Sequence, residues 1–285
     1  MKIMELHLPV MPQNHFAAFI QTLQIELHKL KLTDIIFKLH YQQEDYRVNI
    51  HGHTNGESIL KREIRKQAGT AVSRVLAEYL VDCEEPNLMR KLIRHSYRAD
   101  RDELEAIYRY AKELLDGSLQ EPDLPPPRQK RKAKVAAYIS SYLEEESMLI
   151  VGGFVDFRMP EYRAELREAV ECAIEEIAME QQYQDFISLL KYYAFVQDTV
   201  IPAAHILHKG GQEFQLLNEH MKPLESEFSL DGADEENNGS DEDRIVSTLL
   251  SVSPQKIYIH TKEPELQLVK TIQQIFENRV ELCTV

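Results

Sequence analysis

Residues 100–117, with the sequence DRDELEAIYRYAKELLDG, carry a complete set of signals for one α-helix. Asp100 and Glu103 have the spacing of a capping box, in which each side chain hydrogen-bonds a backbone N–H at the helix start. Gly117 can end the helix. The segment therefore predicts a helix over 100–116, with one apolar stripe at helical spacing. That stripe consists of Leu104, Ile107, Tyr108, Ala111 and Leu114.

Helical patterns continue on both sides of this segment. Apolar stripes predict helices over 57–81, 87–97 and roughly 129–147. Gly152 and Gly153 are expected to break the last of these, leaving 154–158 as a short link. Pro160 then opens another helix, and the apolar residues of 186–196 indicate a separate one after it. Pro122 and Pro125–Pro127 predict a stiff connection over about 116–128.

Both ends of the chain return to β patterns. Residues 2–8, 35–41 and 46–50 alternate as strands do at the N-terminal end. Residues 203–208 and 213–217 flank Gly210-Gly211, a two-residue hairpin signal, and 256–260 and 280–283 are further strands. The predicted fold class is α+β, with mixed α/β lobes at both ends and a helical middle block. The sequence leaves open whether the N- and C-terminal strands share one sheet.

The predicted domain boundaries follow from this pattern. Residues 1–56 form an N-terminal strand-helix-hairpin lobe, and residues 57–200 form the helical block. Residues 201–285 form a C-terminal α/β lobe that contains an acidic loop at 231–243, where seven carboxylates lie among glycine and asparagine.

Composition and charge describe an ordinary globular chain that is strongly acidic. Of 285 residues, 43% are hydrophobic and 28% are charged, and the net charge is −14. Generic attraction to nucleic acid or anionic lipid is therefore not expected, although a local basic patch can still provide it. Cys83, Cys172 and Cys283 lie far apart, which favours a reducing, cytoplasmic location over a disulfide framework. No apolar run reaches the roughly 20 residues of a transmembrane helix.

Several segments together resemble the YtxC-like family of sporulation proteins from endospore-forming bacteria. They are 92–97 (LIRHSY), 153–162 (GFVDFRMPEY), 185–193 (DFISLLKYY) and 245–260 (IVSTLLSVSPQKIYIH), followed by 272–276 (IQQIF) and Arg279-Val280. The resemblance spans roughly residues 90–283. It implies a cytoplasmic role connected with sporulation and supplies no catalytic residue.

Five cations lie together just after Pro125–Pro127, at the start of the predicted 129–147 helix: Arg128, Lys130, Arg131, Lys132 and Lys134. Cations at a helix N-terminus oppose the helix dipole and cost about 0.3–1 kcal/mol each. This placement indicates either a partner that supplies negative charge, such as phosphate, or carboxylates elsewhere in the fold. We take the five as partner-binding candidates.

The 35–53 hairpin is the second basic feature. A four-residue turn at 42–45 would set Tyr41 opposite Tyr46 and His40 opposite Arg47. One face is then apolar. The other face collects Lys38, His40, Arg47, Asn49, His51 and His53, and is either an ordinary solvated face or a surface that accepts phosphates. His51 and His53 are weak metal candidates, since two imidazoles on one strand face suit zinc but need further ligands.

Two further features of the sequence bear on binding. Arg158, in the predicted 154–158 link, is a candidate for a specific structural or binding contact. The aromatic cluster of Phe186, Tyr192, Tyr193 and Phe195 is interpreted as mostly core, with Tyr192 and Phe195 able to face a subunit. A homodimer is compatible with this pattern.

No complete catalytic or nucleotide-binding motif is found, and no cofactor is predicted. Whether the protein is an enzyme stays open, and the absence of these motifs disfavours enzymatic activity. The leading hypothesis is a non-enzymatic sporulation-associated binding or scaffold protein with an unknown protein partner. One alternative is a nucleic-acid-binding protein using the 128–134 segment. Another is a metal-dependent enzyme built on His51 and His53.

Overall fold

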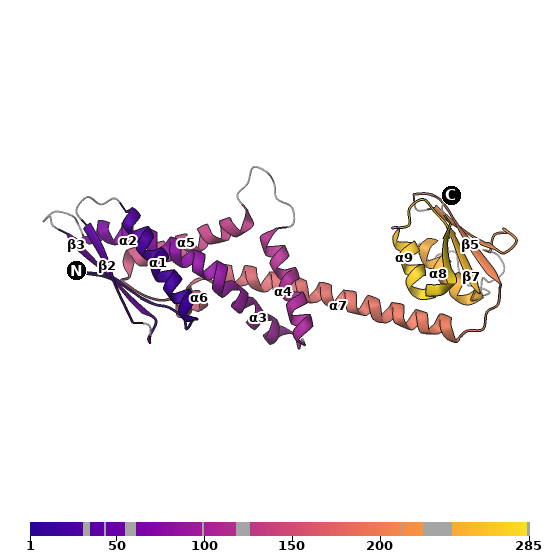
Figure 1. Ribbon diagram of the computed structural model, residues 1–285, viewed down its shortest axis with the longest axis horizontal. Helices are drawn as coiled ribbons and strands as arrows, with labels where there is room; N and C mark the ends of the chain where they lie inside the picture. The colour runs from indigo at the N-terminus through magenta and orange to yellow at the C-terminus, as the bar shows by residue number, and fades with distance from the viewer. Residues whose placement is uncertain are drawn as a thin grey trace. The chain divides into compact units, whose positions relative to one another are not determined.

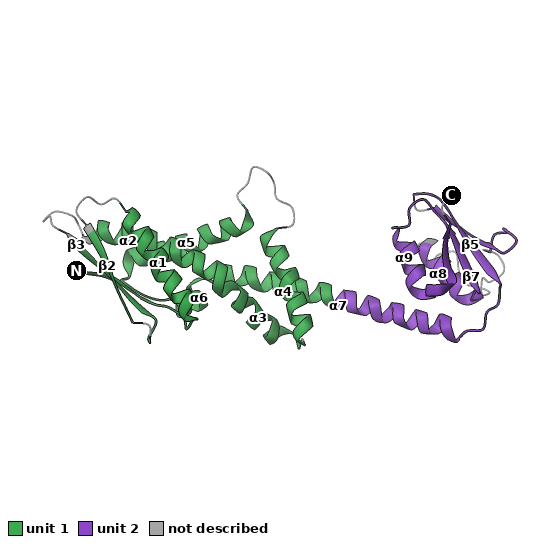
Figure 2. Cartoon of the chain, in the orientation of Figure 1, with its two compact units in different colours: residues 1–177 green, residues 178–285 purple. Residues whose placement is uncertain are grey.

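The chain folds into two compact units, unit 1 (residues 1–177) and unit 2 (residues 178–285) (Figure 2). This computed structural model describes residues 1–30, 35–42, 44–54, 61–98, 100–117, 126–211, 213–224 and 241–283. Most of the predicted 116–128 connection and of the acidic loop at 231–243 lies outside the described residues.

Unit 1 contains a four-stranded sheet in the order β2-β3-β1-β4. Its strands are β1 (Lys2–His7), β2 (Ile35–Gln42), β3 (Arg47–Thr54) and β4 (Met148–Ile150). β3 pairs antiparallel with both β1 and β2, whereas β4 runs parallel to β1. One face of the sheet is apolar, and Leu6, Val48 and Leu149 are buried on it. The helices α1 and α2 lie on this side (Figure 1).

The register of the β2–β3 hairpin differs from the predicted one. Tyr41 lies opposite Val48, and His40 lies opposite Asn49 rather than Arg47. The strand β3 begins only at Arg47, because Tyr46 belongs to the turn, where its φ is 50°. Since the shift is two residues, every side chain keeps its predicted face.

Seven α-helices and a π-helix are described in unit 1, the last α-helix continuing into unit 2. They are α1 (Gln13–Lys29), α2 (Lys61–Tyr79), the π-helix η1 (Leu80–Glu84), α3 (Glu85–Ser96), α4 (Arg101–Asp116), α5 (Pro127–Glu145), α6 (Val151–Arg158) and α7 (Pro160–Val196). The predicted capping box is confirmed: the Asp100 carboxylate accepts hydrogen bonds from the N–H of Asp102 and Glu103 at 2.8 and 2.9 Å. Gly117 follows α4 with φ of 74°.

Two predictions about helix ends are wrong. Gly152 and Gly153 lie inside α6, so the expected 154–158 link is helical. Burial of Val151, Phe154 and Val155 offsets the low helix propensity of the glycines. The helices predicted to begin at Pro160 and near Phe186 are one continuous helix, α7, because residues 178–184 contain no glycine or proline that would end it.

Unit 2 contains a second, separate sheet in the order β6-β5-β7-β8. Its elements are β5 (Ala203–Gly210), β6 (Glu213–Asn218), α8 (Asp241–Val252), β7 (Lys256–His260), α9 (Gln267–Phe276), the 3₁₀-helix η2 (Glu277–Arg279) and β8 (Val280–Cys283). The strands β5, β7 and β8 are parallel, and β6 pairs antiparallel with β5, with Gly210 at the end of β5 opposite Glu213. The N- and C-terminal strands therefore do not share a sheet.

The fold class is α+β with a helical middle block, as predicted. Unit 2 has its own core, in which Ile206, Ile257 and Ile259 of the sheet pack with Leu249 of α8 and Ile272 of α9. Within the described residues, no helix is both long enough and apolar enough to cross a membrane.

Candidate functional site

The predicted basic segment forms the first turns of α5. Arg128 and Lys132 both contact the carboxylate of Asp82 in η1, at 2.9 and 2.7 Å. Lys134 lies 3.7 Å from Glu165 of α7. These cations therefore lie beside carboxylates of the same chain, which compensate their unfavourable position at a helix N-terminus.

Arg131 is the centre of a buried polar cluster. Its side chain is 2% exposed and donates two hydrogen bonds to Glu85, at 3.0 and 3.2 Å, and one to Asp116 at 2.8 Å. It also donates to the backbone carbonyl of Leu115, and the hydroxyl of Tyr162 donates to Glu85 at 3.0 Å. The cluster joins the start of α3, the end of α4, α5 and α7.

The protonation states in this cluster follow from burial and pairing. Burial disfavours the charged guanidinium, but the hydrogen bonds to Glu85 and Asp116 outweigh it and raise the pKa of Arg131. Burial and the Glu85 carboxylate raise the pKa of Tyr162. Arg131 therefore remains a cation and Tyr162 a neutral hydrogen-bond donor, as a structural ion-pair cluster requires.

Lys130 and Arg158 differ from the other predicted partner-binding residues. Both side chains are exposed, and neither forms an ion pair within the part of the chain that the structure describes. Arg158 ends α6 and is not part of the α5 cluster. The structure thus brings together the five cations of 128–134, and four of them form ion pairs with carboxylates of the same chain. A partner-binding role for these residues stays a prediction.

His51 and His53 lie on the solvent face of β3, as the alternation predicts. The ring of His51 makes an edge contact with that of His40, with centroids 4.9 Å apart. Burial, followed by repulsion from His40, lowers the pKa of His51. Among the residues described, no group of three or more His, Cys, Asp or Glu side chains is arranged to hold a metal ion.

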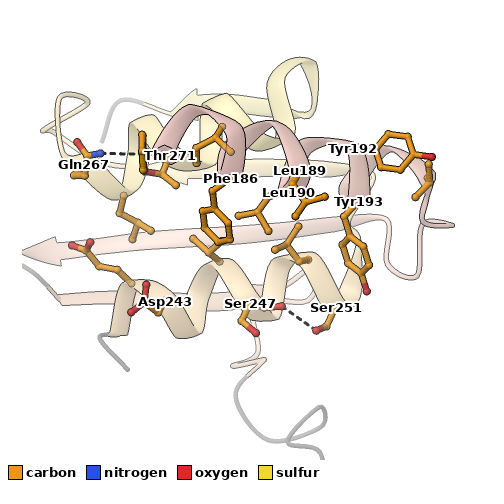
Figure 3. Close-up of a pocket in the computed structure, with 17 residues that line it drawn as sticks. Phe186, Leu189, Leu190, Tyr192, Tyr193, Asp243, Ser247, Ser251, Gln267 and Thr271 are labelled. Atoms are coloured by element: carbon orange, nitrogen blue, oxygen red, sulfur yellow. Dashed lines mark hydrogen bonds between the residues drawn. The ribbon is translucent and has the colours of Figure 1, made fainter. Parts of the chain in front are cut away.

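An open groove of about 910 Å³ lies in unit 2, and the sequence reasoning did not anticipate it. Its walls come from the C-terminal half of α7, from α8 and from α9. In Figure 3, Phe186 and Leu190 project from α7 toward α8. Two hydrogen bonds hold α7 beside α9: the hydroxyl groups of Tyr183 and Thr271 are 3.1 Å apart, and the Gln267 amide lies 3.3 Å from Tyr183.

The prediction that the aromatic cluster on α7 is mostly core is wrong. Phe186 is 55% exposed and Phe195 is 79% exposed, and Leu189 between them is 62% exposed. In the C-terminal part of α7, Ile187 and Ala194 lie on the stripe that is buried in the core of unit 2. A second apolar stripe at 186, 189, 193 and 196 was visible in the sequence. One apolar stripe is enough to pack a helix against its own unit. The presence of a second stripe on the same helix was therefore the sequence signal for an exposed apolar surface.

The groove is acidic at one end. Among its 17 lining residues are the carboxylates of Glu242 and Asp243 at the start of α8, and no lysine, arginine or histidine. A surface of this kind is suited to an apolar ligand that also carries positive charge.

These features define the class of protein to which the chain belongs: a two-unit α+β protein with an exposed apolar groove in its C-terminal unit. The family model described as the YtxC-like family matches residues 70–281, well over half of the chain. The chain therefore belongs to the YtxC-like family.

One curated relative is the "Uncharacterized protein YtxC" of Bacillus subtilis (strain 168). It is 28% identical over 214 residues, which cover 73% of this chain and 74% of that protein. No solved structure matches the chain.

Proposed function

We propose that this chain is a non-enzymatic, cytoplasmic binding or scaffold protein connected with sporulation, and that the groove of unit 2 binds an amphipathic helix of a protein partner. The link with sporulation rests on the sequence resemblance described above. The observation that carries the binding role is the groove itself, an exposed apolar surface on a chain that is otherwise strongly acidic.

A helix suits the shape and spacing of the groove. Helix-in-groove recognition places apolar side chains at i, i+3, i+4 and i+7 of the ligand between two helices of the receptor. Here Phe186, Leu189 and Tyr193 of α7 face Val246 and Leu250 of α8 across the groove. A ligand helix would cover apolar side chains from both walls at once.

The charge of the groove indicates the chemistry of the ligand helix. With Glu242 and Asp243 at one end and no lining cation, lysine or arginine on the ligand would be favoured there. A second copy of this chain is the less favoured occupant, because two proteins of net charge −14 repel each other. A basic amphipathic helix is therefore the proposed occupant.

A designed peptide tests this proposal directly. An 18-residue helix of leucine and lysine, labelled with fluorescein, should raise its anisotropy on titration with the full chain. A scrambled peptide of the same composition controls for attraction between its lysines and the acidic protein. Leu189→Asp should weaken binding about 10- to 100-fold, because burial of a leucine contributes about 1.5–3 kcal/mol.

The matched control is Phe157→Asp, which changes a side chain that is 83% exposed on α6 of unit 1. It should leave the affinity unchanged. Equal binding of the scrambled peptide, or equal affinity of Leu189→Asp, would contradict the proposal. A dimer in sedimentation velocity that Leu189→Asp dissociates would instead assign the groove to a second copy.

The natural partner can be identified by cross-linking. The chain with p-benzoylphenylalanine at position 193 is expressed in sporulating cells, irradiated and analysed by mass spectrometry. The expected product joins the groove to a basic amphipathic segment, and a chain with the cross-linker at position 157 should not give it. A product joined to an acidic or non-helical segment would contradict the proposed occupant.

A further inference from the structure

The solvent face of the sheet in unit 1, here called the outer sheet face, gathers positive charge on an acidic protein. Lys38 of β2 lies opposite His51 of β3, which lies opposite Lys2 of β1. Further along the strands, Arg47 of β3 lies opposite His7 of β1. Alternation from the buried Leu6, Val48 and Ile50 places His7, Lys38, Arg47 and His51 away from the core. The register irregularity between Lys2 and Met4 brings Lys2 to the same face, opposite His51.

Two carboxylates offset part of this charge. Glu5 lies on the same face and hydrogen-bonds both Lys2 and His7, and these bonds lower the pKa of Glu5. Asp45, in the turn before β3, lies 3.5 Å from Arg47. Lys38 forms no ion pair within the described part of the chain.

The same face also exposes apolar side chains on both edge strands. Ile36 of β2 is 59% exposed, and Met148 and Ile150 of β4 are 48% and 53% exposed. Ile150 pairs with His7 and so extends the row that carries Arg47, whereas Met148 pairs with Glu5. Because neighbouring strands lie about 4.8 Å apart, the four strands present a face about 14 Å wide. Lys2 and Arg47, on the two central strands, therefore lie between these apolar side chains, and Lys38 lies on the same edge strand as Ile36.

We propose that the outer sheet face docks peripherally on an anionic phospholipid surface. Lysine and arginine beside a membrane are attracted to anionic headgroups, while exposed isoleucine and methionine can enter the interfacial region. A nucleic acid would use the cations but would leave Ile36, Met148 and Ile150 in water. The acidic remainder of the chain is repelled by an anionic surface, which favours this one face as the point of contact.

The histidines make the attraction depend on pH. His40, His51 and His53 of the hairpin and His7 of β1 join Lys2, Lys38 and Arg47 on this face, with Glu5 and Asp45 as the acids and the Met1 amine near His51. Histidine side chains gain positive charge as pH falls from about 7 to 5. Burial, followed by the surrounding positive groups, lowers the pKa of His51, so this side chain becomes charged at a lower pH than an ordinary histidine. The face is more cationic at pH 5.5 than at pH 7.5.

Vesicle co-sedimentation tests this proposal with the full chain. Vesicles of phosphatidylserine and phosphatidylcholine at a 3:7 ratio should bind the protein, more strongly at pH 5.5 than at pH 7.5, and pure phosphatidylcholine vesicles should not. The pair Lys38→Glu and Arg47→Glu should weaken partitioning by at least about tenfold. The pair Ile36→Ser and Ile150→Ser should weaken it independently, since it leaves the charges in place.

Lys91→Glu with Lys112→Glu is the matched control, because both lysines are exposed on α3 and α4, away from the sheet. This pair makes the same change in net charge and should leave vesicle binding unaltered, as should Leu189→Asp in the groove. Equal loss with the control pair would mean that only net charge matters. Retention on DNA together with no effect of the isoleucine variants would assign the face to nucleic acid. Either result would overturn the proposal.

Discussion

Replacing Arg131 with alanine removes the only cation from the buried cluster formed by Glu85, Asp116 and Tyr162. Four hydrogen bonds are lost, two to Glu85, one to Asp116 and one to the Leu115 carbonyl. Asp116 is 31% exposed and can be solvated by water, but Glu85 is buried and would keep only the Tyr162 hydroxyl. Breaking a buried pair in this way costs about 3–5 kcal/mol of the free energy of unfolding.

The measurement is urea unfolding followed by pulsed hydrogen–deuterium exchange, which resolves peptides from the two units. Peptides from α4 and α5 report on unit 1, and a peptide from α9 in unit 2 is the internal reference. With an m value of about 2–3 kcal/mol/M, Arg131→Ala should lower the unit 1 midpoint by about 1–2.5 M and leave the α9 peptide unchanged. The double variant Arg131→Met, Glu85→Gln should recover most of the loss, because it buries no unpaired charge.

Arg128→Ala is the matched control, since Arg128 lies on the same helix in an exposed ion pair with Asp82. It should cost no more than about 1 kcal/mol. The reasoning is refuted if Arg131→Ala costs as little as Arg128→Ala, or if the double variant is no more stable than Arg131→Ala.

Three further predictions concern a helix cap, a histidine and the basic segment. Asp100→Ala should destabilise α4 by about 0.5–2 kcal/mol, measured by exchange of its first turn. Burial and a neighbouring histidine lower the pKa of His205. The free energy of unfolding of unit 2 should therefore fall as the pH falls from about 6.5 toward that lowered pKa, because the unfolded chain binds the proton more readily. His205→Gln should reduce this dependence of the free energy of unfolding on pH. The nucleic-acid alternative predicts DNA-column retention that falls steeply with salt and is lost when Lys130, Lys132 and Lys134 become alanine; unchanged retention would remove it.

Local patterns were sufficient to predict most helices and strands. The capping box of Asp100 and the hairpin around Gly210-Gly211 depend on residues within a few positions of each other, and both elements are present. The predicted position of the turn was one residue early, because Gly210 is the last residue of β5 and lies opposite Glu213. The two faces of the β2–β3 hairpin were also predicted correctly. Side chains alternate between faces, so the error of two residues in the predicted strand pairing leaves every side chain on its predicted face. The register itself was not predicted correctly, since the turn uses Tyr46 in a positive-φ conformation that the spacing does not reveal.

The candidate sites needed information that no local pattern contains. The residues of the buried cluster, Glu85, Asp116, Arg131 and Tyr162, are distant in sequence, and only the packing of four helices brings them together. The groove depends on which of two apolar stripes of α7 is buried, and burial is decided by the helices beside it.

The sequence by itself determined the α+β class, the positions of most helices and the assignment of charged side chains to faces, because these follow from short-range periodicity. It also carried the family resemblance, which rests on several specific segments rather than on periodicity. Tertiary structure alone decided that β4 joins the N-terminal sheet, that four of the five cations at the start of α5 meet carboxylates, and that one stripe of α7 stays exposed. The physical reason is that burial and ion pairing depend on distances between residues that are remote along the chain.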